Sequence, residues 1–105
     1  MMTSAITGTC NFNNFGQHRV VKDEGRGVGR KIDISLEACK TFCNQDPRCN
    51  SVAYCNAQFH SNECFTKEKV LHGNEATKYS EGCTTYFRDC GIVFFILRKL
   101  DFRAS

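Results

Sequence analysis

Residues 35–49 read SLEACKTFCNQDPRC and contain the strongest helix signal in the chain. Ser35 is suited to cap a helix, because its hydroxyl can accept a hydrogen bond from a backbone N–H of the first turn. Pro47 ends the helix near Gln45, since the residue before a proline resists the α conformation. Apolar residues recur at helical spacing and define one face. This face consists of Leu36, Cys39, Phe42 and Cys43.

Short runs of alternating or β-branched residues on both sides of this helix predict strands. The runs are residues 19–22, 31–34, 49–55, 64–70 and 83–90. The glycines at 25–29 predict a loop or hairpin turn, and residues 71–82 predict a polar connection. One helix among several strands indicates an α+β fold with an antiparallel sheet.

The chain has 105 residues and 8 cysteines, a proportion close to that of disulfide scaffolds from oxidising compartments. Only Cys39 and Cys43 have the close spacing of a zinc knuckle, and the three histidines are scattered. A catalytic cysteine would leave an odd number of cysteines for bridges. The pattern therefore favours four structural disulfides over zinc or a thiol enzyme, and we expect no metal and no cofactor.

Charge and hydropathy exclude several other classes of protein. The net charge is +3, with 14 Lys and Arg against 11 Asp and Glu, which is low for a nucleic-acid-binding domain of this size. No apolar run approaches the roughly 20 residues of a membrane-spanning helix. We therefore expect no nucleic-acid partner and no transmembrane span in this chain.

The two ends of the chain raise separate questions. Residues 1–10 lack the basic start and apolar core of a signal peptide. We therefore expect a fragment of a secreted protein or a start placed too late; the alternative is a cytosolic protein with reduced or metal-bound cysteines. The tail at residues 91–105 has six apolar residues in a row. Three interpretations of this tail are considered: a truncated or artefactual extension, an edge strand, or a membrane-associated segment. In each case the module itself is expected to span residues 10–90.

Over residues 10–90 the chain resembles the PAN/Apple family. The resemblance is carried by SLEACKTFCNQDPRCNSVAY (35–54), NECF (62–65) and TTYFRDC (84–90). The family pattern joins a helix with C-x3-C to an Asp-Pro-x-Cys segment, an apolar-aromatic strand and later cysteines. The resemblance implies a central helix packed on a curved antiparallel sheet of about five strands.

The resemblance also implies a disulfide framework and a role. The implied bridges are Cys39–Cys64 and Cys43–Cys49 as the inner pair and Cys10–Cys90 joining the termini. The family does not fix partners for Cys55 and Cys83, which the other bridges leave to pair with each other. The resemblance implies that the shared role of these modules is to bind proteins or glycans outside the cell, and not catalysis. Their ligand residues vary, so none is transferred to this chain.

The leading hypothesis is an extracellular binding or adhesion module, part of a larger secreted or membrane-anchored protein, with a protein or carbohydrate ligand. The alternatives are a non-binding structural spacer and a module for acidic, heparin-like glycans. The glycan alternative rests on a basic cluster, partly offset by Asp23 and Glu24, that comprises Arg19, Lys22, Arg26, Arg30 and Lys31. A neutral glycan or protein would instead use exposed aromatics such as Tyr79 or Phe59. The sequence shows no nucleophile–base pair or carboxylate cleft typical of a hydrolase.

Overall fold

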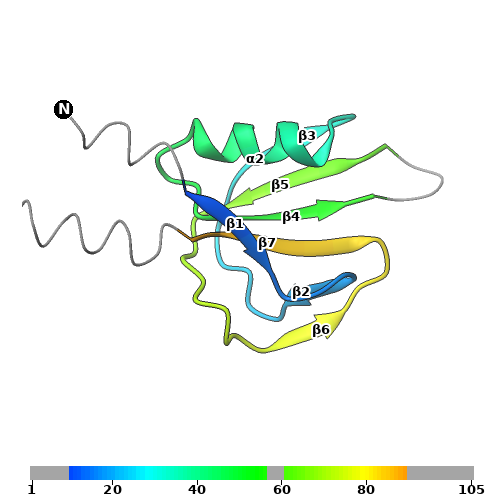
Figure 1. Cartoon of the computed structure of the whole chain (residues 1–105). Coiled ribbons are helices and arrows are strands. Elements are labelled where there is room, and N and C mark those ends of the chain that lie inside the picture. The colour runs from blue at the N-terminus through cyan, green and yellow to red at the C-terminus, as the bar shows by residue number, and fades with distance from the viewer. Residues whose placement is uncertain (1–9, 57–60, 90–105) are drawn as a thin grey trace, which may run out of the picture.

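The computed structural model describes residues 10–56 and 61–89, which form an α+β fold (Figure 1). The helix is α2 (Leu36–Asn44). The strands are β1 (Asn11–Asn14), β2 (Arg19–Val21), β3 (Gly27–Ile32), β4 (Ser51–Cys55), β5 (Glu63–Lys67), β6 (Thr77–Tyr79) and β7 (Cys83–Asp89). Five of them form an antiparallel sheet in the order β1-β7-β4-β5-β3, and β2 pairs with β6 in a second sheet. The predicted fold class, one helix on a five-stranded antiparallel sheet, is confirmed.

Helix α2 begins where the sequence predicts. The Oγ atom of Ser35 accepts a hydrogen bond from the backbone N–H of Ala38 at 3.1 Å, so this residue is the N-cap. The helix ends at Asn44, and the N–H of Gln45 closes the last turn on the carbonyl of Thr41 at 3.0 Å. The cap and the proline therefore set the limits of α2, as expected from their backbone chemistry.

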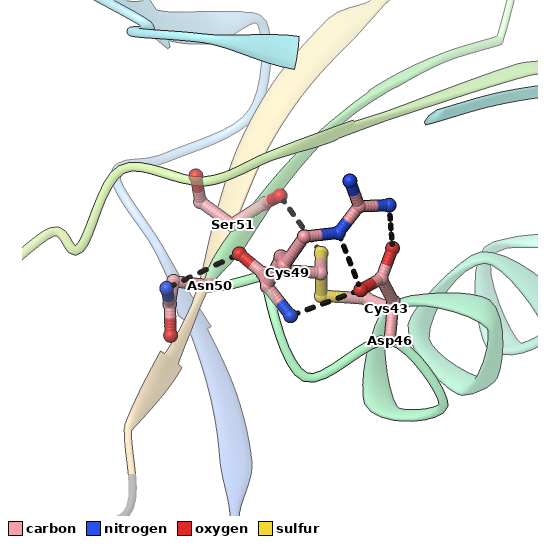
Figure 2. Close-up of polar contacts among 6 residues, drawn as sticks. Cys43, Asp46, Cys49, Asn50 and Ser51 are labelled. Atoms are coloured by element: carbon pink, nitrogen blue, oxygen red, sulfur yellow. Dashed lines mark hydrogen bonds and ion pairs between the residues drawn. A yellow bond between two sulfur atoms is a disulfide. The ribbon is translucent and has the colours of Figure 1, made fainter. Parts of the chain in front are cut away.

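The turn after the helix is held by one carboxylate and one disulfide, as Figure 2 shows. Asp46 accepts hydrogen bonds from the backbone N–H of Arg48 at 2.9 Å and from its guanidinium at 3.1 Å. The N–H of Cys49 donates to the carbonyl of Asp46 at 2.9 Å, and a bridge joins Cys49 to Cys43. These contacts carry the chain from the end of α2 to the start of β4.

The apolar face of α2 packs on one side of the main sheet. Cys39 and Cys43 are fully buried there, and the Cys39–Cys64 bridge fixes the helix to β5. Their cluster also contains buried Cys49, Val52 and Tyr54, with Leu36 and Phe42 packed at its edge. The face predicted from helical spacing is therefore the face that meets the sheet.

A second, smaller core lies on the opposite side of the sheet, where the β2–β6 pair covers β7 (Figure 1). Val21, Leu71 and Phe87 are buried together, and the ring of Phe15 lies 5.1 Å from that of Phe87. The N–H of Val21 donates to the Oγ1 atom of Thr85 at 3.2 Å and ties β2 to the sheet. The main sheet is therefore covered by α2 on one face and partly by the β2–β6 pair on the other.

Two expectations about loops are wrong. Strand β6 lies inside residues 71–82, which the sequence predicts to be a polar connection, and it is extended because it pairs with β2. Strand β3 begins at Gly27, inside the glycines predicted to be a loop or turn. Position 29 suits glycine, which has no Cβ atom, because a Cβ atom there would lie only 2.9 Å from the Oγ1 atom of Thr66 on the neighbouring strand. The sequence also did not predict strand β1, which the structure contains.

The structure contains three of the four bridges that the resemblance implies: Cys39–Cys64, Cys43–Cys49 and Cys55–Cys83. The Cys55–Cys83 bridge joins residues that lie directly opposite each other in β4 and β7. Because Cys90 is not among the described residues, the predicted Cys10–Cys90 bridge lies outside them, as do Phe59 and the tail at residues 91–105. None of the helices in the described part of the chain has the length and hydropathy needed to cross a membrane.

Candidate functional site

The two basic residues of β3 lie on opposite faces of the main sheet, because consecutive side chains of a strand alternate. Arg30 pairs with Glu63 at 2.6 Å, and its guanidinium lies 5.6 Å from the ring centroid of Phe65. Lys31 lies on the side of α2, with its Nζ atom 5.0 Å from the ring centroid of Phe42. The structure therefore does not bring these two members of the predicted basic cluster together.

The other three basic residues lie at or between β2 and β3. Arg19, in β2, donates two hydrogen bonds to the Oγ1 atom of Thr77, at 3.0 and 3.3 Å. Lys22 and Arg26 are exposed at either end of the connection between the strands. The carboxylates between them, Asp23 and Glu24, pair with Lys69 and Lys67 at 3.0 and 3.1 Å. This surface therefore carries mixed charge rather than a continuous basic patch.

A different group of side chains surrounds an open cavity of about 610 Å³. The cavity lies where β4 ends and β7 begins, beside the first turn of α2 and the loop between β1 and β2. We call it the loop-end cavity. Its principal polar and aromatic side chains are Gln17, His18, Tyr54, Asn56, Asn62 and Tyr86. Among the described residues, no Asp, Glu, Lys or Arg side chain lines it.

His18 is held rigidly at this cavity in the left-handed region of backbone conformation, with φ 63°. Its N–H donates to the Oγ1 atom of Thr84 at 3.1 Å, and its carbonyl accepts from the N–H of Ser80 at 2.7 Å. The ring Nδ1 atom accepts from the N–H of Gly82 at 2.8 Å. Because Nδ1 is the acceptor in this bond, Nε2 is the ring nitrogen left to donate. Such enforced conformations are typical of functional sites.

Tyr54, in β4, and Asn62, directly before β5, supply polar groups to one part of the cavity wall. The phenol of Tyr54 donates a hydrogen bond to the carbonyl of Ile34 at 2.8 Å. Burial raises the pKa of Tyr54, and the nearby Tyr86 raises it further. The phenol therefore stays protonated and keeps its oxygen as an acceptor.

Glycine at position 82 brings two parts of the cavity close together. Gly82 has φ +83°, and a Cβ atom there would lie 3.2 Å from the carbonyl oxygen of Asn56. The N–H of Asn56 in turn donates to the carbonyl of Gly82 at 2.6 Å. The side chains of Asn56 and Gln17 are exposed, so their amide groups are accessible.

An exposed aromatic ring extends the site beyond the cavity wall. Tyr79, in β6, is 62% exposed, and its ring centroid lies 5.9 Å from that of His18. The sequence names Tyr79 as a candidate for contacting a neutral glycan or a protein, and the structure places it beside the loop-end cavity.

Sequence reasoning missed the cavity itself. Its residues come from five segments that are far apart in the chain, and none of them forms a motif. The weak signals available were the tyrosines of two predicted strands, Tyr54 and Tyr86, and the single Gly82 before the last strand. Neither the tyrosines nor the glycine indicates that the end of β4 and the start of β7 lie close together.

The chemistry of the site is that of hydrogen bonding and ring stacking. The hydroxyls of Ser35 and Thr84, which also line the cavity, already accept hydrogen bonds from Ala38 and His18. No group of three or more His, Cys, Asp or Glu residues in the described part of the chain is placed to hold a metal ion. Comparisons with protein-family models, curated proteins and solved structures found no match to this chain.

Proposed function

We propose that the chain is an extracellular binding module of the PAN/Apple kind, which takes a protein or carbohydrate ligand in the loop-end cavity. The observation that carries this proposal is the cavity's wall of uncharged hydrogen-bonding and aromatic side chains, gathered at the loop end of a rigid sheet. Binding residues are disproportionately found on loops that a rigid scaffold positions. A concave site with a few fixed polar groups is typical of ligand recognition.

The disulfides support the extracellular part of the proposal. Three bridges in a small domain are consistent with an oxidising compartment. Two of them also support the PAN/Apple assignment, because the helix cysteines Cys39 and Cys43 pair with the partners that the resemblance implies. The Cys55–Cys83 bridge lies next to the cavity residues Asn56 and Gly82 and fixes their separation.

Binding is favoured over catalysis because the Nδ1 acceptor of His18 and the hydroxyl oxygens of Ser35 and Thr84 are already engaged in hydrogen bonds. A general base needs a free acceptor within reach of a nucleophile. The Nδ1 atom of His18 is occupied by Gly82, and the Ser35 and Thr84 hydroxyls accept hydrogen bonds from backbone N–H groups. These groups therefore act as fixed supports of the wall.

The test is a binding screen with the oxidised full-length chain immobilised on a sensor surface. The probes are a printed array of neutral and acidic oligosaccharides, heparin, and a panel of purified extracellular proteins. We expect saturable binding of at least one probe, which is lost after reduction and alkylation and weakened in the Gln17→Ala, Asn56→Ala double variant. Binding to none of the probes would overturn the proposal in favour of a structural spacer.

Heparin, one of the probes, distinguishes the acidic-glycan alternative from binding in the loop-end cavity. In that case retention would depend on the basic residues and would fall steeply with salt, because exposed charges are screened over about 8–10 Å at physiological ionic strength. A triple variant, Arg19→Ala, Arg26→Ala, Arg30→Ala, would then lose retention while the cavity variant kept it. The opposite pattern is expected if the cavity is the site.

A further inference from the structure

We infer that the ligand of the loop-end cavity is an uncharged saccharide. This inference rests on the proposed binding function and narrows it to one class of ligand. It follows from four properties of the site, which are its lack of charge, its balance of donors and acceptors, its exposed rings and its place within the sheet.

The absence of Asp, Glu, Lys and Arg from the described lining residues argues against ionic ligands. No Asp, Glu, Lys or Arg side chain of the described residues lines the cavity, and the Nδ1 atom of His18 accepts a hydrogen bond from the N–H of Gly82. A charged group that leaves water needs an opposite charge or several strong hydrogen bonds to compensate. The described part of this wall offers no Asp, Glu, Lys or Arg as a counter-charge for a carboxylate, sulfate or ammonium group.

The described side chains of the cavity wall include both hydrogen-bond donors and hydrogen-bond acceptors. Each carboxamide offers two N–H donors and one carbonyl acceptor, and three of them, Gln17, Asn56 and Asn62, line the cavity. The Nε2–H group of His18 adds a donor, and the phenol oxygen of Tyr54 adds an acceptor. A sugar hydroxyl both donates and accepts, so it matches such a wall. An apolar ligand would leave these groups unpaired.

The rings provide the apolar contact that a sugar also needs. The ring of Tyr86 lines the cavity, and Tyr79 is exposed beside His18. The face of an aromatic ring carries partial negative charge, which attracts the polarised C–H groups on the flat side of a pyranose. A cavity of about 610 Å³ lies within the range of small-molecule sites, roughly 300–1,000 Å³, and has room for one or two sugar rings.

The position of the cavity argues against an extended peptide, which is the other kind of uncharged ligand that could form hydrogen bonds with the carboxamides of the wall. Peptides commonly bind by adding a strand to a free sheet edge. The edge strands of the main sheet are β1 and β3, whereas Tyr54, Thr84 and Tyr86 belong to the inner strands β4 and β7. Strand β4 is paired over its whole length on both sides, with β5 and with β7, so it has no backbone available for a peptide, and β7 is paired with β1 from Tyr86 to Asp89.

The test is a titration of the oxidised full-length chain, by calorimetry and by saturation-transfer NMR. The probes are glucose, galactose, mannose, N-acetylglucosamine and disaccharides of these sugars. Glucuronic acid and glucosamine serve as charged analogues of nearly the same shape. We expect at least one neutral sugar to bind, with the charged analogues weaker. The affinity should be equal at about 0.05 M and about 0.5 M salt, because the contacts involve no net charge.

Variants locate the contact. Gln17→Ala and Asn56→Ala should each weaken binding by roughly tenfold, as expected for a lost hydrogen bond that leaves a buried hydroxyl unpaired. Tyr79→Ala should weaken it, whereas Tyr79→Phe should retain it, because the stacking ring remains. Asn74→Ala is the matched control, since Asn74 is an exposed amide that does not line the cavity. Circular dichroism of each variant establishes that the fold is retained.

The outcomes separate this inference from the proposed function. If only charged sugars bind, or if no sugar binds while a purified protein binds through Gln17 and Asn56, the saccharide inference is wrong and the binding module stands. Equal loss of affinity in Asn74→Ala and Asn56→Ala would also overturn it. If neither sugars nor proteins bind, the inference and the proposed function both fail.

Discussion

Asp46 shows how a single side chain stabilises a disulfide loop. Its carboxylate accepts from the backbone N–H, the Nε atom and the Nη2 atom of Arg48, at 2.9, 3.2 and 3.1 Å. The carboxylate therefore fixes both the backbone and the side chain two residues further on. Between Cys43 and Cys49, which are six residues apart, these contacts restrict the short turn that the bridge closes.

We expect this arrangement to be visible in a titration. The pKa of Asp46 is lowered from its ordinary value of 3.8, mainly by the side-chain hydrogen bond of Arg48 and next by the backbone N–H of Arg48. Since the folded-state pKa lies below the unfolded one, the contact stabilises the fold above the ordinary pKa and is lost as pH falls through the folded value. Carboxyl-carbon NMR should give a midpoint below 3.8.

The Arg48→Ala variant tests the cause. Its Asp46 midpoint should rise but stay below the ordinary value, because the backbone N–H of residue 48 remains. Arg26→Ala is the control, since the exposed Arg26 makes no contact with Asp46. An Asp46 midpoint that is identical in the parent and in Arg48→Ala would contradict this account.

At the scale of elements, the fit of β3 beneath α2 depends on one glycine. A Cβ atom at Gly29 would lie 2.9 Å from the Oγ1 atom of Thr66 and 3.2 Å from the Cζ atom of Phe42. At Gly27, in the same strand, the nearest atom would lie 3.8 Å away, which is an ordinary contact. The two glycines therefore differ in packing while sharing one strand.

Gly29→Ala should lower the free energy of unfolding by about 1–3 kcal/mol, as expected for overpacking of a tight contact. Gly27→Ala, the matched control, should be neutral or slightly stabilising, because alanine reduces the entropy of the unfolded chain. Urea unfolding of the two oxidised variants gives the comparison. If Gly29→Ala is as stable as Gly27→Ala, β3 does not pack against Phe42 as closely as described.

Two bridges connect elements in different ways. Cys39–Cys64 joins α2 to β5, whereas Cys55–Cys83 joins strands that are already paired. Their sequence separations, 25 and 28 residues, are almost equal, so the loop-entropy contributions are nearly the same, about 3–4 kcal/mol each. Any difference between them must arise from burial and from the elements they connect.

We therefore expect Cys39→Ser to destabilise the protein more than Cys55→Ser. Cys39 and Cys64 are both 0% exposed, so the substitution places a hydroxyl and a free thiol in the main core. Cys55 is only partly buried, and the β4–β7 pairing persists without its bridge. Thermal unfolding of the two variants measures the difference, and equal losses would contradict the distinction.

At the scale of the whole molecule, local chemistry explains which elements were predictable. Ser35 and Pro47 act on their own neighbours, so the limits of α2 could be predicted from the sequence. The strands β1 and β6 could not: NFNN lacks strong strand preference, and TKY contains strand-forming residues but is only three residues long, so both depend on their pairing with β7 and β2. Such pairing depends on distant residues rather than on local propensity.

The candidate site was less predictable for the same reason. The predicted basic cluster used neighbours in sequence, but alternation along β3 places Arg30 and Lys31 on opposite faces. The loop-end cavity instead gathers Gln17, Tyr54 and Gly82 from distant segments through the antiparallel order of the strands. Of the two aromatic residues that the sequence names as ligand contacts, Tyr79 lies beside that cavity, and Phe59 is outside the described residues.

The last prediction concerns what holds the molecule together. In the chain-entropy model, the three described bridges, with separations of 25, 6 and 28 residues, contribute about 2–4 kcal/mol each. Their sum is comparable with the whole stability of a small domain, about 5–15 kcal/mol. Dithiothreitol should therefore abolish the circular dichroism of the native fold, while EDTA should leave it unchanged.

Titration of the unfolded, oxidised chain with a thiol reagent is the accompanying measurement, and it should detect no free thiol. Loss of structure with EDTA alone would contradict disulfide stabilisation and favour zinc. If the fold instead survives complete reduction, the two cores on either side of the sheet are sufficient without covalent links. The bridges would then no longer indicate an oxidising compartment, and the extracellular proposal would lose its main support.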